Sequence, residues 1–256
     1  MKSLNLTPAE SLMIISPNSS GDEMIKFTLM DLLLKRNLKL DMEEKCRLCI
    51  CEGESSISTK PHETILIELV LEHHELKLKE FAEILYEKVG SSAEYKNKYI
   101  RDPLVEKGYF KRQRKMLLAL APYFVYVLTD DGLELKSKIM ELLDEAENLQ
   151  KWIKNDLGHA KAYLSVLGSH ILLTNNYDID NIKKFNRMLS YLKPESNTQE
   201  YYGYYLYSVP NGYLDDYGNL KSFNFLDMSL LDNFSSFNEF FSYLTSDLVK
   251  NKVKTK

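Results

Sequence analysis

The stretch that decides the fold is "LVEKGYFKRQRKMLLALAPYFVYVLTDDG", residues 104–132. Its segments 108–120 and 123–129 are rich in aromatic and branched side chains, and the turn signal Ala121-Pro122 separates them. These features predict two strands that pair as an antiparallel hairpin. The first strand carries four basic residues within five positions, whereas "MLLALAP" (116–122) is apolar. A function for this hairpin has to account for both halves.

Periodic apolar side chains predict helices on both sides of the hairpin. Upstream, helical spacing covers residues 19–40, 62–74, 75–90 and 93–108, and "KCRLCICEG" (45–53) is a candidate short strand. Ser and Asp side chains open the first of these helices, Pro61 is placed to begin the second, and Gly90 to end the third. Pro103 is expected to bend or divide the fourth, because proline removes a backbone donor. Downstream, Thr129 is expected to cap a long helix over 130–153.

The character of the chain changes beyond about residue 155. Helices are expected over 156–173, 178–192 and 234–250, and a strand-turn-strand with seven tyrosines over 201–217. A chain of 256 residues exceeds the common size of one compact domain, so we expect two. The prediction is an α+β, mostly helical protein with domains at 1–154 and 155–256, the second smaller and α+β.

Composition excludes several classes of protein. Hydrophobic residues make up 44% of the chain and charged residues 27%, which is ordinary for a globular protein. No apolar run is long enough for a membrane-spanning helix, and the N-terminus lacks a signal peptide's pattern, so a cytoplasmic protein is expected. Cys46, Cys49 and Cys51 lack a suitably placed fourth ligand and are interpreted as small strand-filling residues. No metal or cofactor is predicted.

The charge is distributed unevenly. Residues 96–115 contain eight basic and two acidic side chains, a net charge of +6, although the whole chain carries -4. The rest of the chain therefore carries -10. A local positive field of this kind steers an anionic partner, and the simpler alternative is a solvated face.

Catalytic motifs are missing from the sequence. We find no Gly-rich phosphate loop, nucleophile elbow or zinc-protease helix. His62, His159 and His170 stand alone, and the adjacent His73 and His74 point in different directions. The protein is therefore predicted not to be an enzyme.

The order of elements and three segments resemble the winged helix, and MarR-like bacterial regulators in particular, over about residues 20–150. "LKLKEFAEIL" (76–85) looks like the positioning helix, "AEYKNKYIRDPLVEKGYF" (93–110) like the recognition helix and first wing strand, and "VYVLTDDGLELKSKI" (125–139) like the second wing strand and exit helix. The resemblance implies a winged helix-turn-helix N-terminal domain and a DNA-binding transcriptional regulator, with the recognition helix in the major groove and the wing along the backbone. On these positions it assigns groove contacts to Lys96, Asn97, Lys98 and Arg101, and backbone contacts to Lys111, Arg112, Arg114 and Lys115. Asn97 and Arg101 are the candidates for base readout, because each can make bidentate pairs.

The resemblance also implies partners. Double-stranded DNA is the predicted ligand, a homodimer is expected because two-fold DNA sites favour symmetric dimers, and the helix over 133–153 is a candidate dimerisation arm. The C-terminal domain would bind a small-molecule effector or a protein. The tyrosine cluster is interpreted as core or interface packing, with base or ligand stacking as its alternative.

Two features depart from the winged-helix pattern. Pro103 interrupts the recognition helix, and the end of the wing at 116–122 is apolar. Exposed apolar tips mark protein or membrane contacts, unless the C-terminal domain or a second subunit covers them. "FTLMDLLLKRNLKL" (27–40), "NKYIRDPLVEKGYF" (97–110) and the hairpin also resemble the Golgi phosphoprotein 3 type of domain, which implies a hydrophobic hairpin that enters an anionic membrane. Our alternative is thus a non-enzymatic interaction module that docks this hairpin on protein or membrane.

Overall fold

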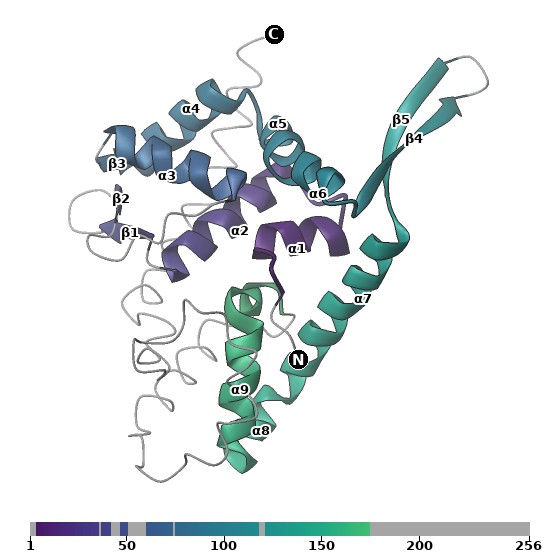
Figure 1. Ribbon diagram of the computed structural model, residues 1–256. Helices are drawn as coiled ribbons and strands as arrows, with labels where there is room; N and C mark the ends of the chain where they lie inside the picture. Colours follow the sequence, from purple (N-terminus) through teal and green to yellow (C-terminus); the bar gives the residue numbers. More distant parts are fainter. Residues whose placement is uncertain are drawn as a thin grey trace.

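The computed structural model describes residues 4–35, 37–41, 47–50, 60–73, 75–117 and 121–174. This part of the chain is mostly helical with two small antiparallel sheets, as expected for the α+β class (Figure 1). The elements predicted at 178–192, 201–217 and 234–250 lie outside the described residues.

Two capped helices open the fold. Helix α1 (Pro8–Ile15) begins after Thr7, and α2 (Gly21–Leu34) begins after Ser20. Each cap is reciprocal: the hydroxyl accepts from the backbone of a glutamate three residues later, whose carboxylate accepts from the backbone of the cap. The serine cap of α2 was predicted, but α1 was not.

A three-stranded antiparallel sheet explains two wrong helix boundaries. It consists of β1 (Leu38–Asp41), β2 (Arg47–Ile50) and β3 (Glu75–Lys77), in that order. The predicted helix over 19–40 ends at Leu34 because β1 follows it. The predicted helix over 75–90 begins only at Leu78, as α4 (Leu78–Val89), because residues 75–77 pair with β2. The strand predicted at 45–53 is confirmed in β2.

Other helix limits follow the predicted signals. Helix α3 begins at its proline (Pro61–His73), and α4 ends before Gly90, whose φ of +82° suits glycine. A cap at Ser91 then starts α5 (Ser92–Tyr95).

The bend predicted at Pro103 takes the form of a wider helical turn. Helix α5 continues through a π-helical segment, η1 (Lys96–Arg101), into α6 (Asp102–Glu106). The amide of Asp102 donates to the carbonyl of Asn97, five residues back. Proline cannot donate a backbone hydrogen bond and its ring clashes with the carbonyl four residues earlier, so the wider turn accommodates it.

Strands β4 (Phe110–Leu117) and β5 (Ala121–Leu128) form the predicted antiparallel hairpin. The predicted position of the turn is wrong, however. Ala121 and Pro122 pair with Leu117 and Met116 inside the ladder, so the connection comprises residues 118–120. The hairpin is a separate two-stranded sheet that projects from the helices (Figure 1).

After the hairpin, the chain returns along the body in three helices. Helix α7 (Asp130–Glu145) begins at the predicted cap, Thr129. A 3₁₀ turn, η2 (Ala146–Asn148), separates it from α8 (Leu149–Asn155), so the predicted continuous helix over 130–153 is broken. Helix α9 (Leu157–Leu167) and a second 3₁₀ segment, η3 (Gly168–Leu173), follow. Segment η3 packs on α1, α2 and α7, so the described residues beyond 154 share the core of those before it.

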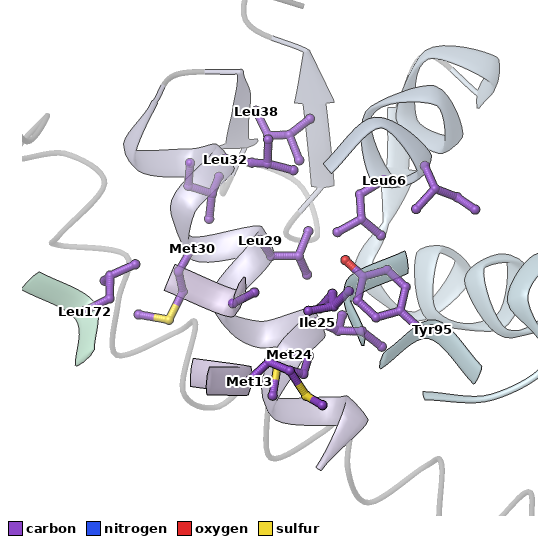
Figure 2. Packing of buried hydrophobic residues seen from close by; sticks show 14 of the residues in the cluster. Met13, Met24, Ile25, Leu29, Met30, Leu32, Leu38, Leu66, Tyr95 and Leu172 are labelled. Atoms are coloured by element: carbon purple, nitrogen blue, oxygen red, sulfur yellow. The ribbon is translucent and has the colours of Figure 1, made fainter. Parts of the chain in front are cut away.

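Helix α2 runs through the middle of this core (Figure 2). Ile25, Leu29, Leu66 and Tyr95 are buried together there, and the Tyr95 hydroxyl donates to the backbone carbonyl of His62 at 2.8 Å. The carbonyl of Ser92 lies so close to Gly21 that a Cβ there would be 1.9 Å from its oxygen. Glycine thus lets α5 approach α2 and seats the segment that leads to the hairpin.

Candidate functional site

The hairpin is held firmly at its base. Phe110 is buried there, and the Thr129 hydroxyl donates to the carbonyl of Gly108 at 2.7 Å. The amide of Thr129 donates to the carbonyl of Tyr109, and a Cβ on Gly132 would lie 2.2 Å from that same oxygen. The two ends of the hairpin and the start of α7 therefore form one rigid junction.

The two faces of the hairpin differ. Residues directly opposite in an antiparallel ladder share a face, and alternate positions take alternate faces. The register pairs Arg112 with Tyr126 and Arg114 with Phe124. We call this side the arginine face. The other side, the lysine face, pairs Lys111 with Val127 and Lys115 with Tyr123. Two of the four predicted wing cations thus lie on each side, as strand spacing predicts.

Stacked arginines line the arginine face. The guanidinium carbon of Arg101 lies 3.9 Å from the ring centroid of Tyr126, and that of Arg112 lies 3.7 Å from the centroid of Phe124. Contacts this short place the cation directly over the aromatic ring. Arg101 also pairs with Asp102 at 3.5 Å. It is mostly buried, and the hairpin base already occupies it.

The other three helix residues that were predicted to contact DNA differ in how exposed their side chains are and in whether the protein already binds them. The ammonium of Lys96 donates to the carbonyls of Pro17 and Ser19, at 2.6 Å each. Partial burial and the nearby Arg101 charge lower the pKa of Lys96. Because of these two hydrogen bonds, Lys96 holds the loop between α1 and α2. Asn97 is half-buried, whereas Lys98 is exposed.

The outer part of the hairpin is both charged and apolar. Lys111, Arg112, Arg114 and Lys115 are all exposed, and within the described residues no carboxylate pairs with them. Met116 is 55% exposed, Phe124 50% and Tyr123 44%. Large apolar side chains at this exposure are usual at interaction surfaces when they gather in one place.

A buried polar network lies elsewhere, around α1, and was not predicted from the sequence. The carboxylate of Glu10 pairs with Lys107 at 2.9 Å and with Lys60 at 3.1 Å. His62 exchanges a 2.8 Å hydrogen bond with the Thr7 hydroxyl, and His170 one with Ser11. Two of the three histidines that stand alone in the sequence, His62 and His170, therefore flank α1.

The two histidines share a lowered pKa. Burial lowers the pKa of both His62 and His170 to about 4, so each is neutral near pH 7. The ring of His170 also contacts the carbonyl of Leu167 through Nδ1 at 3.1 Å. A carbonyl only accepts, so Nδ1 carries the proton and Nε2 accepts from Ser11.

A second buried group joins α2 to α3. The ammonium of Lys35 lies 2.7 Å from Asp31 and 2.8 Å from Glu63. Although burial alone would lower it, the two carboxylates raise the pKa of Lys35. These contacts bind α2 to α3.

In the described ranges, no group of three or more His, Cys, Asp or Glu side chains is arranged to hold a metal ion. Cys49 is a buried cysteine in β2, while Cys46 and Cys51 lie outside the described residues. None of the helices that the structure describes is long and apolar enough to cross a bilayer.

No protein-family model matches the chain, and no curated protein is significantly similar to it. Function therefore has to be inferred from the hairpin itself.

Proposed function

We propose that the protein docks on an anionic phospholipid surface through the hairpin β4–β5. The observation that carries this proposal is the order along the hairpin: a fixed base, then exposed cations, and then exposed apolar side chains that begin level with Arg114 and Lys115 and continue to Met116, before an end that is apolar in sequence. Such an order matches the layers of a membrane surface, in which phosphates lie outside hydrocarbon. The resemblance of residues 27–40 and 97–110 to the Golgi phosphoprotein 3 type of domain supports it.

The binding free energy that the hairpin side chains can supply is sufficient for docking on an anionic membrane. Each Lys or Arg near an anionic membrane surface contributes about 1 kcal/mol, so the four hairpin cations together supply at most about 4 kcal/mol. Insertion of apolar side chains adds about 25 cal/mol for each Å² removed from water. Neither the attraction of the cations nor the burial of the apolar side chains gives strong binding alone, and together they give reversible binding.

Binding to vesicles tests the proposal. The full chain should sediment with vesicles of phosphatidylcholine and phosphatidylserine, and much less with phosphatidylcholine alone. Added salt should weaken binding, because it screens exposed charges. Absence of sedimentation with the anionic vesicles at low salt would remove this function.

A matched pair of methionines tests the apolar part. Met116 lies near the hairpin end and is 55% exposed, while Met140 on α7 is 45% exposed. Met116→Ser should weaken vesicle binding several-fold, and Met140→Ser should leave it unchanged. Equal effects of the two would show that the hairpin end does not insert.

DNA binding is the second candidate, in the role of a winged-helix, MarR-like regulator. The order α3, α4, α5 to α6 and hairpin supports it, as does the exposed Lys98 in η1, in the segment that leads to the hairpin. It is placed second because Lys96 and Arg101 already have partners within the protein.

A gel shift separates the two candidates. A DNA-binding protein should retard duplex fragments at low salt, lose affinity steeply as salt rises, and lose more when Lys98 becomes Glu. A membrane-docking protein should show vesicle binding that Met116→Ser weakens, and duplex binding that the same change leaves unaltered.

A further inference from the structure

The two faces of the hairpin carry equal charge in different surroundings. Each presents two cations, which are two residues apart on the arginine face and four residues apart on the lysine face. The arginine face adds Phe124, Tyr126 and Met116, whereas the lysine face adds valines and Tyr123. A purely coulombic attraction would not distinguish the faces, so any preference has to come from side-chain chemistry.

Arginine and lysine differ in that chemistry. The guanidinium is planar, weakly hydrated and able to donate two parallel hydrogen bonds to one phosphate, whereas the ammonium is a strongly hydrated point charge. Stacking of Arg112 on Phe124 uses the flat face of the guanidinium and leaves its N–H edge free. That edge has no carboxylate partner among the described residues. It is therefore available to an external phosphate.

The arginine face also carries exposed apolar side chains. Phe124 and Met116 lie on the same face as Arg112 and Arg114. Apolar faces of surface-bound segments sink about 5–10 Å below the headgroups. In a hairpin that lies by this face on a bilayer, the two apolar side chains therefore enter the lipid beside guanidinium groups at the level of the phosphates.

We propose that the hairpin lies on the membrane by its arginine face, with the guanidinium groups of Arg112 and Arg114 on lipid phosphates. Phe124 and Met116 enter the region below, and the lysine face stays in water. This inference rests on the proposed docking function and adds an orientation to it. The alternative orientation is insertion of the hairpin end first, in which both faces meet the lipid equally.

Charge-matched variants test the orientation. Arg112→Gln with Arg114→Gln removes two charges from one face, and Lys111→Gln with Lys115→Gln removes two from the other. With phosphatidylserine vesicles, the arginine pair should lose about 30-fold in binding, at about fivefold for each cation in contact with the surface. The lysine pair should lose less than about fivefold in total, since its charges act from a distance.

A charge-conserving variant isolates the chemistry. Arg112→Lys with Arg114→Lys keeps both charges but loses the planar fork and the stacking on Phe124. Binding should fall several-fold at unchanged net charge. Binding as tight as that of the native chain would overturn the role given to the guanidinium groups.

Depth measurement gives an independent readout. Phe124 and Tyr123 are neighbours on opposite faces with similar exposure. On vesicles of brominated lipid, the fluorescence of Phe124→Trp should be quenched strongly and that of Tyr123→Trp weakly. Trp152, packed between His159 and Tyr163 in the body, provides the same background in both.

The outcomes of these experiments distinguish a failure of the arginine-face orientation from a failure of the proposed membrane docking. Equal quenching of the two tryptophan variants, or equal losses in the two glutamine pairs, would overturn the arginine-face orientation while vesicle binding by the native chain still supported docking. Failure of the native chain to bind anionic vesicles would remove the docking function and the orientation together.

Discussion

Acid should destabilise the fold through the two buried histidines beside α1. Burial lowers the pKa of His62 and His170 to about 4, whereas an unfolded histidine titrates near 6.5. Folding therefore favours the neutral rings. Their contribution to stability is complete above about pH 6.5 and is lost as the pH falls from there toward 4.

The size of this loss follows from the shift. Between about pH 7 and pH 5, each of the two histidines becomes protonated in the unfolded state but stays neutral in the folded state. At about 1.4 kcal/mol for each pKa unit, the loss is about 2 kcal/mol for one ring and about 4 kcal/mol for both. A domain of ordinary stability, about 5–15 kcal/mol, would be noticeably weakened.

Urea unfolding at several pH values, followed by Trp152 fluorescence, measures this loss in the free energy of unfolding. His62→Gln and His170→Gln should each reduce the loss between about pH 7 and pH 5 by about 2 kcal/mol, and the double variant should reduce it by about 4 kcal/mol. Each variant is compared with itself, so a general destabilisation by the substitution cancels. A double variant that still lost as much stability as the native chain would refute the reasoning.

Two further sites test the packing by the same unfolding measurement. Gly132→Ala should cost about 1–3 kcal/mol, because its Cβ would meet the Tyr109 carbonyl, whereas Gly158→Ala in the open part of α9 should gain up to about 1 kcal/mol. If Gly132→Ala proved neutral, the tight junction at the hairpin base would be wrong. Lys35→Met should cost about 3–5 kcal/mol, since it leaves the buried Asp31 and Glu63 without their shared cation. An unchanged midpoint for that variant would contradict the importance given to the ion group.

Features that depend on neighbouring residues were predictable from the sequence. The cap at Thr129, the stop at Gly90 and the hairpin itself all follow from short-range chemistry. The division near Pro103 was also expected, although nothing in a single sequence distinguishes a kink from a π-helical turn. The exposed wing cations were correctly placed on two faces, because strand alternation is local geometry.

Features that depend on distant partners were missed. Strands β1 and β3 exist because they pair with β2, and neither carries a strong signal of its own. The turn signal at Ala121-Pro122 was misleading, because proline is also tolerated in the outer strands of a sheet. His62 reaches Thr7, 55 residues away, and His170 reaches Ser11 across 159 residues. The carbonyls that occupy Lys96 likewise come from a distant loop.

The hairpin's isolation has a consequence for how copies of the protein meet. Among the described strands, none pairs with the outer side of β4 or of β5, so both edges of the ribbon present free backbone donors and acceptors. Such edges invite strand addition by a second copy, and proteins commonly oppose this with lysine and arginine side chains on the exposed strand. The cations of this hairpin would oppose such pairing in water. An anionic surface that neutralised them would lift that protection and allow neighbouring ribbons to pair edge to edge.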